Sequence, residues 1–366
     1  MKAKFMAIAA LPVLLLAACA EEEPVAPQAE EATREAISFR PSMSGLSRAS
    51  EITNANLSDI NVTALLDGQN YFSDLVFSKD NTGFYNSAKS YYWPGDTSTL
   101  DFYAYYPSMD VMGCDVTINK DTKEITSFQT AENIADQVDL ITAHGTGTKA
   151  KNEAAGVPLE FKHRLAQIEI RAKSNNPSYT FTVKGVRIGR PQYLGTFNMA
   201  DSSWTLDEWH DTFVLESSCD SVVLSSTPVS IMGASGNAML IPQTLVEWNH
   251  NGDPDNAARG TYLSVLVRIV SDTGVQMFPF PSESAHTAEL FHHHGYAWAA
   301  IPFSGTWEQG KKYIYTLDFT EGAGYVDPDG PTPGQPVMGQ PIKVVSQVED
   351  WTEDDIPVSM KPSEYN

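Results

Sequence analysis

The sequence predicts an all-β protein of sandwich type, and two observations carry this prediction. Its 15 Tyr, 16 Phe and 7 Trp, punctuated by 24 Gly and 22 Pro, favour many short strands over long helices. From Asn61 onward, short alternating runs of apolar and polar residues are separated by turn signals. Such spacing suggests β-sandwiches and not alternating βαβ units.

Length and charge narrow the class of protein further. A chain of 366 residues corresponds to about two domains and can bury sizeable cores. Lys and Arg number 24 against 46 Asp and Glu, which gives a formal net charge of −22. Because neutralising phosphates requires clustered Lys and Arg, this balance argues against a nucleic-acid partner.

The N-terminal residues predict export and a lipid anchor. An apolar stretch from Phe5 to Leu16 follows two lysines. It is shorter than the roughly 20 residues of a membrane-spanning helix and has the form of a signal peptide. Small residues then lead into Cys19, an order that matches the lipobox of bacterial lipoproteins and predicts Cys19 as the lipidation site. The alternative is an ordinary signal peptide with a chance cysteine near its end.

The segment after Cys19 is polar, with one exception. The acidic run at 21–23 is either a surface-export signal or a solvated tether, and residues 20–48 as a whole are typical of a flexible tether. Within them, Ile37 and Phe39 alternate with polar neighbours, which is the period of a short half-buried strand.

The alternating runs beyond this segment predict the strands in order. The clearest extends from Leu100 to Tyr106, with apolar or aromatic side chains at every even position and prolines on either side. A helical turn is expected within 133–140. The other predicted strands are 62–66, 75–77, 168–172, 181–188, 213–215, 222–224, 238–241, 262–270, 275–280, 297–303 and 313–319.

Two polar stretches predict how the chain is divided. The turn cluster at 173–177 is a candidate domain boundary. Residues 322–341, rich in Pro and Gly, are typical of a semi-stiff linker. Two alternating pieces follow, and because they have no obvious hairpin partner they must pair with something else. Their apolar faces are formed by Ile342, Val344 and Val348 in the first piece and by Ile356, Val358 and Met360 in the second.

The search for catalytic groups indicates no enzyme. The sequence has no Gly-x-Ser-x-Gly elbow and no Cys-x-x-Cys pair, and nothing in it places two carboxylates together. Residues 144–149 only superficially resemble a phosphate loop, and we interpret them as a surface turn. We interpret the histidines at 292–294 as an exposed loop, because adjacent strand residues point to opposite faces and cannot chelate one metal. No cofactor and no metal site are expected.

Two further features have a structural and a functional interpretation. Tyr91, Tyr92 and Trp93 either close a core or stack on sugar rings. His163 shares a face with apolar neighbours, so we expect it to point inward and to be hydrogen-bonded rather than catalytic. Cys114 and Cys219 are expected to be buried small apolar residues, since two cysteines set no disulfide framework.

Several segments together resemble the fimbrillin family, the lipoprotein pilins of type V pili in Gram-negative anaerobes. Each segment is degenerate alone, and their order along nearly the whole mature chain is the specific signal. They are Tyr91–Pro94 with Leu100–Pro107, Asp139–Ala143, Leu159–Ile168, Leu240–Gln243, Trp307 with Gly310–Tyr315, and Val348–Trp351. The resemblance implies two tandem transthyretin-like β-sandwich domains with a C-terminal strand-bearing tail, and a structural role in an adhesive surface filament.

The resemblance also implies how such subunits assemble. The pilin reaches the outer membrane as a lipoprotein, an arginine-specific protease cuts near its N-terminus, and loss of the leading strand leaves a groove that a neighbouring subunit's strand fills. We expect the cut at Arg48–Ala49, whose small polar surroundings suit protease access, because the short N-terminal strand would then leave with the prosegment. Arg34 and Arg40 are the alternatives.

The donor strand is expected in the tail from Ile342 to Met360, and its alternative is an ordinary last strand of the second domain. The partners expected are neighbouring pilin subunits, the protease, surface ligands of host or bacteria, and the outer membrane through the lipid. The rival function is a monomeric glycan-binding surface lipoprotein that presents Tyr92, Trp93 or other exposed aromatics. The expected division is a signal peptide at 1–18, a tether and removable prosegment at 19–48, sandwiches at 49–175 and 176–326, and a linker with donor strands at 327–366.

Overall fold

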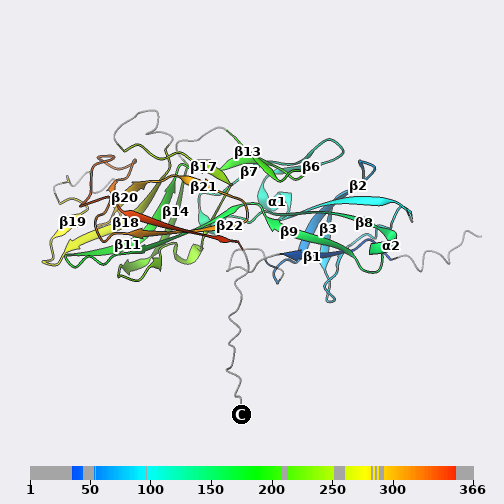
Figure 1. Cartoon of the computed structure of the whole chain (residues 1–366), viewed down its shortest axis with the longest axis horizontal. Coiled ribbons are helices and arrows are strands. Elements are labelled where there is room, and N and C mark those ends of the chain that lie inside the picture. The colour runs from blue at the N-terminus through cyan, green and yellow to red at the C-terminus, as the bar shows by residue number, and fades with distance from the viewer. Residues whose placement is uncertain are drawn as a thin grey trace, which may run out of the picture. The chain divides into compact units, whose positions relative to one another are not determined.

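The computed structural model describes residues 35–43, 53, 55–95, 97–207, 213–250, 260–281, 283, 284, 287 and 292–351 (Figure 1). From Ala36 onward these residues belong to one compact unit. Strands dominate it, and its named helices have only three or four residues. The all-β prediction is therefore confirmed. Among the described residues, no helix combines the length and the apolar character that a membrane crossing requires.

The N-terminal strands form a sheet that closes on itself, because β1 pairs with both β4 and β9. Apolar side chains alternate along these strands and meet inside the sheet, where Phe77, Phe102 and Phe161 are at most 1% exposed. We call this cluster the closed-sheet core. In order around the sheet, the strands are β1 (Phe39–Met43), β4 (Tyr85–Ser87), β3 (Gln69–Lys79), β2 (Asp59–Leu66), β5 (Thr99–Tyr106), β8 (Ile141–Thr148) and β9 (Val157–His163).

A second group of strands forms two sheets that share one core, as a β-sandwich does. Ile168 and Tyr315 from one sheet and Phe181 and Val265 from the other belong to a single buried cluster, the sandwich core. The first sheet has the order β15 (Val229–Ser230), β10 (Ala166–Lys173), β22 (Lys311–Asp318) and β24 (Lys343–Asp350), with β16 (Ala238–Leu240) also on β10. The second has the order β14 (Val214–Val223), β11 (Tyr179–Gly189), β18 (Tyr262–Ser271), β20 (Ala297–Pro302) and β23 (Tyr325–Val326), with β19 (Gln276–Phe278) on β18.

A fourth sheet joins strands from both halves of the sequence. The hairpin β6–β7 arises between β5 and β8, yet β7 pairs with β12, which follows β11. Phe128 on β7 and Phe197 on β12 share a further core with Tyr105 of the closed sheet. The elements concerned, with the remaining short ones, are β6 (Asp115–Ile118), β7 (Lys123–Gln129), β12 (Leu194–Asn198), β13 (Ser203–Leu206), β17 (Gln243–Leu245), β21 (Gly305–Trp307), α1 (Met109–Met112), α2 (Lys149–Asn152), and the 3-10 helices η2 (Ile134–Asp136) and η3 (Gly233–Ser235).

Two interpretations made from the sequence are wrong. Residues 144–149, interpreted as a surface turn, are the end of β8, which pairs with β5 and runs into α2. The expected linker at 322–341 is instead part of the folded sandwich, since Ala323 and Val337 are buried in the sandwich core. Backbone bridges also join Gly322 to Gly339 within it. Pro and Gly serve tight packed turns as readily as linkers, so composition alone does not distinguish the two.

Other expectations are confirmed wholly or in part. The helical turn is η2. The histidines at 292–294 lie in a loop, where His293 and His294 are exposed but the His292 side chain is only 12% exposed. Both cysteines are free thiols; Cys114 is buried as expected, whereas Cys219 is only half-buried. Burial raises the pKa of the Cys114 thiol to about 11. The domain boundary expected at 173–177 does not lie there: this turn connects β10 and β11, which both contribute to the sandwich core, and the chain leaves the closed sheet earlier, between β9 and β10.

Candidate functional site

The candidate site is strand β1 together with the two strands that hold it. Just before β1 and within it, Ile37, Phe39 and Met43 are buried, at 1%, 0% and 7% exposure, whereas Arg40 and Ser42 are exposed; Ser38 departs from the predicted alternation, because it is also buried, at 8%. The apolar side chains enter the closed-sheet core, and Arg40 and Ser42 face outward because successive strand residues point to opposite sides.

β1 is held mainly by one neighbour. It runs parallel to β9 over its whole length, from Phe39 opposite Val157 to Met43 opposite Phe161. On its other side it pairs with β4 only through Phe39 and Tyr85. Because β1 is the strand that joins β9 to β4, its removal would open the closed sheet and leave the backbone groups of β9 without partners along this edge.

The side chain of Phe39 fixes β1 in the core. Its ring lies edge-on to the rings of Phe77 and Phe102, with centroids 4.7 and 5.0 Å away, an arrangement that aromatic pairs prefer. The hydroxyl of Tyr85 next to it donates to the Leu57 carbonyl at 2.6 Å. Burial, with Asp59 nearby, raises the pKa of Tyr85 to about 12, so this donor keeps its proton at neutral pH.

Truncating this anchor should destabilise the uncut chain. We expect Phe39→Ala to lower the free energy of unfolding by about 3–5 kcal/mol, the usual cost of removing a buried aromatic ring. Ser42→Ala, an exposed position of the same strand, is the matched control and should change it by less than about 0.5 kcal/mol. Denaturant unfolding of the two variants measures both values. Equal losses would contradict the packing role of β1.

Of the predicted processing residues, only Arg40 lies among the residues that the structure describes. Arg40 lies within β1, where its backbone is paired and its guanidinium carbon sits 3.9 Å from the centroid of the Phe84 ring. Arg34, Arg48 and Ala49 lie outside the described residues, and so does the predicted lipidation site Cys19. A protease needs an accessible extended segment, so the paired backbone at Arg40 argues against cleavage there in the folded chain.

The C-terminal strand is β24, and it pairs within its own chain. Along its whole length it is antiparallel to β22, with Val348 opposite Tyr313. It is an edge strand of its sheet. Ile342 is buried in the sandwich core, Val344 is half-buried against it, and Val348 is 54% exposed. This is the intradomain pairing that the sequence left as the alternative to a donor strand. Ile356, Val358 and Met360 lie outside the described residues, and the donor assignment stays a prediction.

A contact that sequence reasoning missed ties this last strand to the closed sheet. Trp351, just past β24, stacks on His163 at the end of β9, with ring centroids 4.1 Å apart and planes 7° from parallel. His163 is buried and lies 2.7 Å from the Asp139 carboxylate through Nδ1, which confirms the inward, hydrogen-bonded histidine. The alternation around His163 could predict its burial, but no local pattern connects it to a residue far along the chain.

The aromatic run before β5 closes a core. Trp93 is 7% exposed and Tyr91 packs against the closed-sheet core, whereas Tyr92 between them is 40% exposed. Because the neighbours of Tyr92 point into the protein, the run presents one exposed ring to solvent. The structural interpretation of this run is therefore the one that the geometry supports.

Comparison with known proteins identifies the family. A family model described as fimbrillin-like matches residues 47–351. The chain belongs to the fimbrillin-like family. The solved structure of a fimbrial protein from Bacteroides vulgatus is 15% identical in sequence to this fimbrillin-like chain, and the match covers 86% of this chain and 99% of the other. The TM-score is 0.56, so the two share a fold.

Two other solved structures have lower TM-scores. A candidate cell adhesion protein from Bacteroides uniformis is 17% identical, with 88% and 99% of the two chains covered and a TM-score of 0.49. The fimbrial anchor protein Mfa2 from Porphyromonas gingivalis is 11% identical, with 78% and 90% covered and a TM-score of 0.32. No curated protein matches the fimbrillin-like chain.

Proposed function

We propose that this chain is a structural subunit of a cell-surface pilus that assembles by strand exchange. In this proposal it is exported as a lipoprotein acylated at Cys19 and cut after Arg48 by an arginine-specific protease. It then polymerises when a strand of a neighbouring subunit replaces β1. Membership of the fimbrillin-like family supports the role of pilus subunit. The observation that carries the mechanism is the position of β1, which completes the closed sheet and precedes the proposed cut.

The groove that β1 occupies is suited to an exchanged strand. Its floor is the closed-sheet core, and β9 offers a backbone edge five residues long. A donor therefore needs an extended backbone and apolar side chains on one face, as Ile37 just before β1 and Phe39 and Met43 within it provide. Leaving such a groove empty would expose aromatic side chains and an unpaired edge, so an exchanged strand stabilises the cut subunit.

The tail has the pattern that the groove requires. Apolar residues recur at every second position at Ile356, Val358 and Met360, and Ile342, Val344 and Val348 share one face around β24, with Ser346 between them. Strand β24 would have to leave β22 to act as donor. Both remain candidates, and the proposed filament follows from either. Its proposed location is the outer membrane before the cut and the extracellular pilus after it, where surface ligands of host or bacterial cells are the expected further partners.

The proposal is tested by triggering the cut in the purified chain. A site for an added sequence-specific protease replaces residues 47–49, and cleavage should convert the monomer into a ladder of multimers that resists detergent. An excess of a peptide covering residues 35–43 should suppress the ladder by occupying the groove. The same peptide with Phe39→Asp should not, because it would bury a charge in the core. A cut chain that stays monomeric after the prosegment has dissociated would contradict strand exchange.

A further inference from the structure

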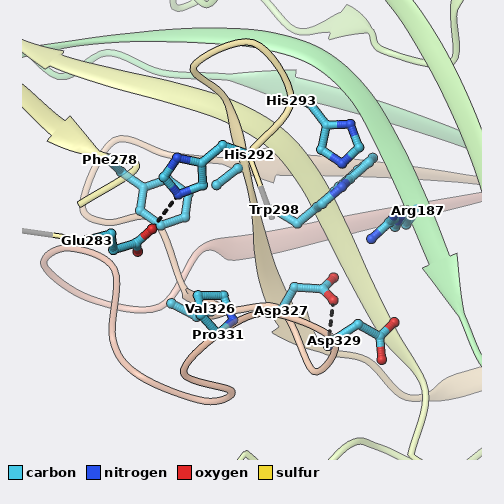
Figure 2. Close-up of a pocket in the computed structure, with 12 residues that line it drawn as sticks. Arg187, Phe278, Glu283, His292, His293, Trp298, Val326, Asp327, Asp329 and Pro331 are labelled. Carbon is cyan, nitrogen blue, oxygen red and sulfur yellow. Dashed lines mark hydrogen bonds and ion pairs between the residues drawn. The ribbon is translucent and has the colours of Figure 1, made fainter. Parts of the chain in front are cut away.

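A cavity of about 240 Å³ is lined by residues of β11, β19, β20 and β23 and of the loop after β23 (Figure 2). The inward residues of β11 and β20, such as Ile188 and Ala299, belong to the sandwich core. Arg187 and Trp298 alternate with them and therefore point to the opposite face. The loop after β23 contributes Asp327 and Asp329 to the same cavity. Segments that are far apart in the sequence thus line one cavity, which the sequence alone did not predict.

Trp298 contributes the largest aromatic side chain of the cavity lining. The residue is 6% exposed, and its indole Nε1 is buried with no hydrogen-bond partner among the described residues. A buried donor without an acceptor costs about 1–3 kcal/mol, so such groups usually meet water or a ligand. One face of the ring is covered by Arg187, whose guanidinium carbon lies 4.0 Å from the ring centroid.

Two carboxylates form the polar side of the cavity. Asp327 is 1% exposed and accepts hydrogen bonds from the Ser264 hydroxyl and, at 2.9 Å, from the backbone N–H of Asp329. Burial raises the pKa of Asp327. The Asp329 side chain is 54% exposed and forms an ion pair with Arg190, whose Nη2 lies 3.5 Å from Oδ1, and it accepts a hydrogen bond from the Tyr262 hydroxyl at 3.2 Å. Asp329 therefore keeps capacity to accept a further hydrogen bond from a molecule in the cavity.

The opposite side of the cavity is apolar and closed by an ion pair. Figure 2 shows Phe278, Val326 and Pro331 on the other side of the view from Arg187, with the ion pair of Glu283 and His292 drawn next to Phe278. Phe278 and Val326 are buried, at 2% and 3% exposure. The cavity thus presents an apolar wall facing a set of hydrogen-bonding groups, which is the usual composition of a small-molecule site.

Size and charge decide the class of ligand. The volume is below the range of roughly 300–1,000 Å³ of pockets for drug-sized molecules, so the cavity fits one small ring. Asp327, Asp329 and Glu283 disfavour an anion, as does the net charge of −22. Arg187 over the indole disfavours a cation. A neutral ligand rich in hydroxyls remains, because a hydroxyl can both accept from the Trp298 N–H and donate to Asp329.

We propose that this cavity binds one neutral monosaccharide unit. The apolar C–H face of the sugar packs against the wall formed by Phe278, Val326 and Pro331, while its hydroxyls bond Trp298 Nε1 and the Asp329 carboxylate. The site lies in the sandwich and not in the groove of β1, so it requires neither the cut nor polymerisation. It would give a surface subunit a means of adhesion to glycans at a place other than Tyr92.

The test is a binding experiment on the uncut, monomeric full chain. Saturation-transfer NMR and calorimetry with the methyl glycosides of glucose, galactose, mannose and N-acetylglucosamine should show binding of at least one. Glucuronic acid and glucosamine, which add a charge to the same ring, should bind at least about tenfold more weakly, a difference of 1.4 kcal/mol. Absence of binding by all four neutral glycosides would overturn the proposal, as would a preference for either charged sugar.

Matched variants locate the site. Trp298→Phe keeps an aromatic ring and removes the N–H, so affinity should fall about 3- to 10-fold, the value of one hydrogen bond. Asp329→Asn changes an exposed side chain and should also weaken binding, and it carries the test if Trp298→Phe does not fold. Tyr92→Ala, which removes the exposed aromatic of the other candidate surface, should leave affinity unchanged. Loss of binding in Tyr92→Ala with full binding in Asp329→Asn would overturn the assignment.

Discussion

Replacing Arg48 by Ala should leave the chain uncut and monomeric at the cell surface, with Cys19 and strand β1 still attached. The reason is geometric: while β1 stays joined to the chain, it occupies the groove between β9 and β4, and no donor strand can enter. We expect multimers resistant to detergent to fall below detection. N-terminal sequencing and intact mass, with immunoblots of unheated samples, measure both effects.

Two control variants separate Arg48 from the other candidate arginines. Arg34→Ala should mature normally, because the cut that frees β1 would remain. Arg40→Lys keeps a positive charge over Phe84 and should also mature normally, because the backbone at that position is paired within the sheet. Normal maturation of Arg48→Ala would move the cut to Arg34 or Arg40 and contradict the proposed prosegment.

Charges placed on the donor face should abolish polymerisation without unfolding the monomer. Val348 and Val345 lie on the same strand and are 54% and 51% exposed, but alternation puts them on opposite faces. If β24 is the donor, Val348→Asp should prevent the multimer ladder, since a buried carboxylate in the acceptor groove costs several kcal/mol. Val345→Asp should leave the ladder intact, and both monomers should unfold at the same denaturant concentration.

The same assay distinguishes the two candidate donor segments. Val358→Asp should block polymerisation if the donor lies beyond β24, and Val348→Asp should then have no effect. Ile342→Asp is unsuitable for this purpose, because Ile342 is 5% exposed in the sandwich core and a charge there would unfold the monomer. Filaments that form normally in both Val348→Asp and Val358→Asp would contradict the assignment of the donor to the tail.

The elements that the sequence predicts well are those encoded by local alternation. The run from Leu100 to Tyr106 becomes β5, and the inward positions of Ile37, Phe39 and His163 follow from period-two patterns. These patterns state which face of a strand is buried. They do not state which strand lies beside it, so the parallel pairing of β1 with β9, more than a hundred residues away, was not predictable.

The failures have the same origin. Residues 322–341 have the Pro- and Gly-rich composition of a linker, yet their turns pack against the sandwich core. Pro and Gly occur in packed turns as well as in linkers, and only the tertiary contacts distinguish the two. The cavity at Trp298 joins residues from β11, β19, β20 and the loop after β23, and none of these stretches contains a motif. Trp351 belongs to a segment that resembles the fimbrillin family, but its stacking on His163 depends on the fold.

The central claim is that the mature subunit has lost β1 and accepts a strand from its neighbour. The most direct measurement is the N-terminus and intact mass of the protein taken from the cell surface, together with its state of assembly. The account predicts a chain that begins at Ala49 within detergent-resistant multimers. A chain that begins at acylated Cys19, retains residues 37–43 and is monomeric would contradict it.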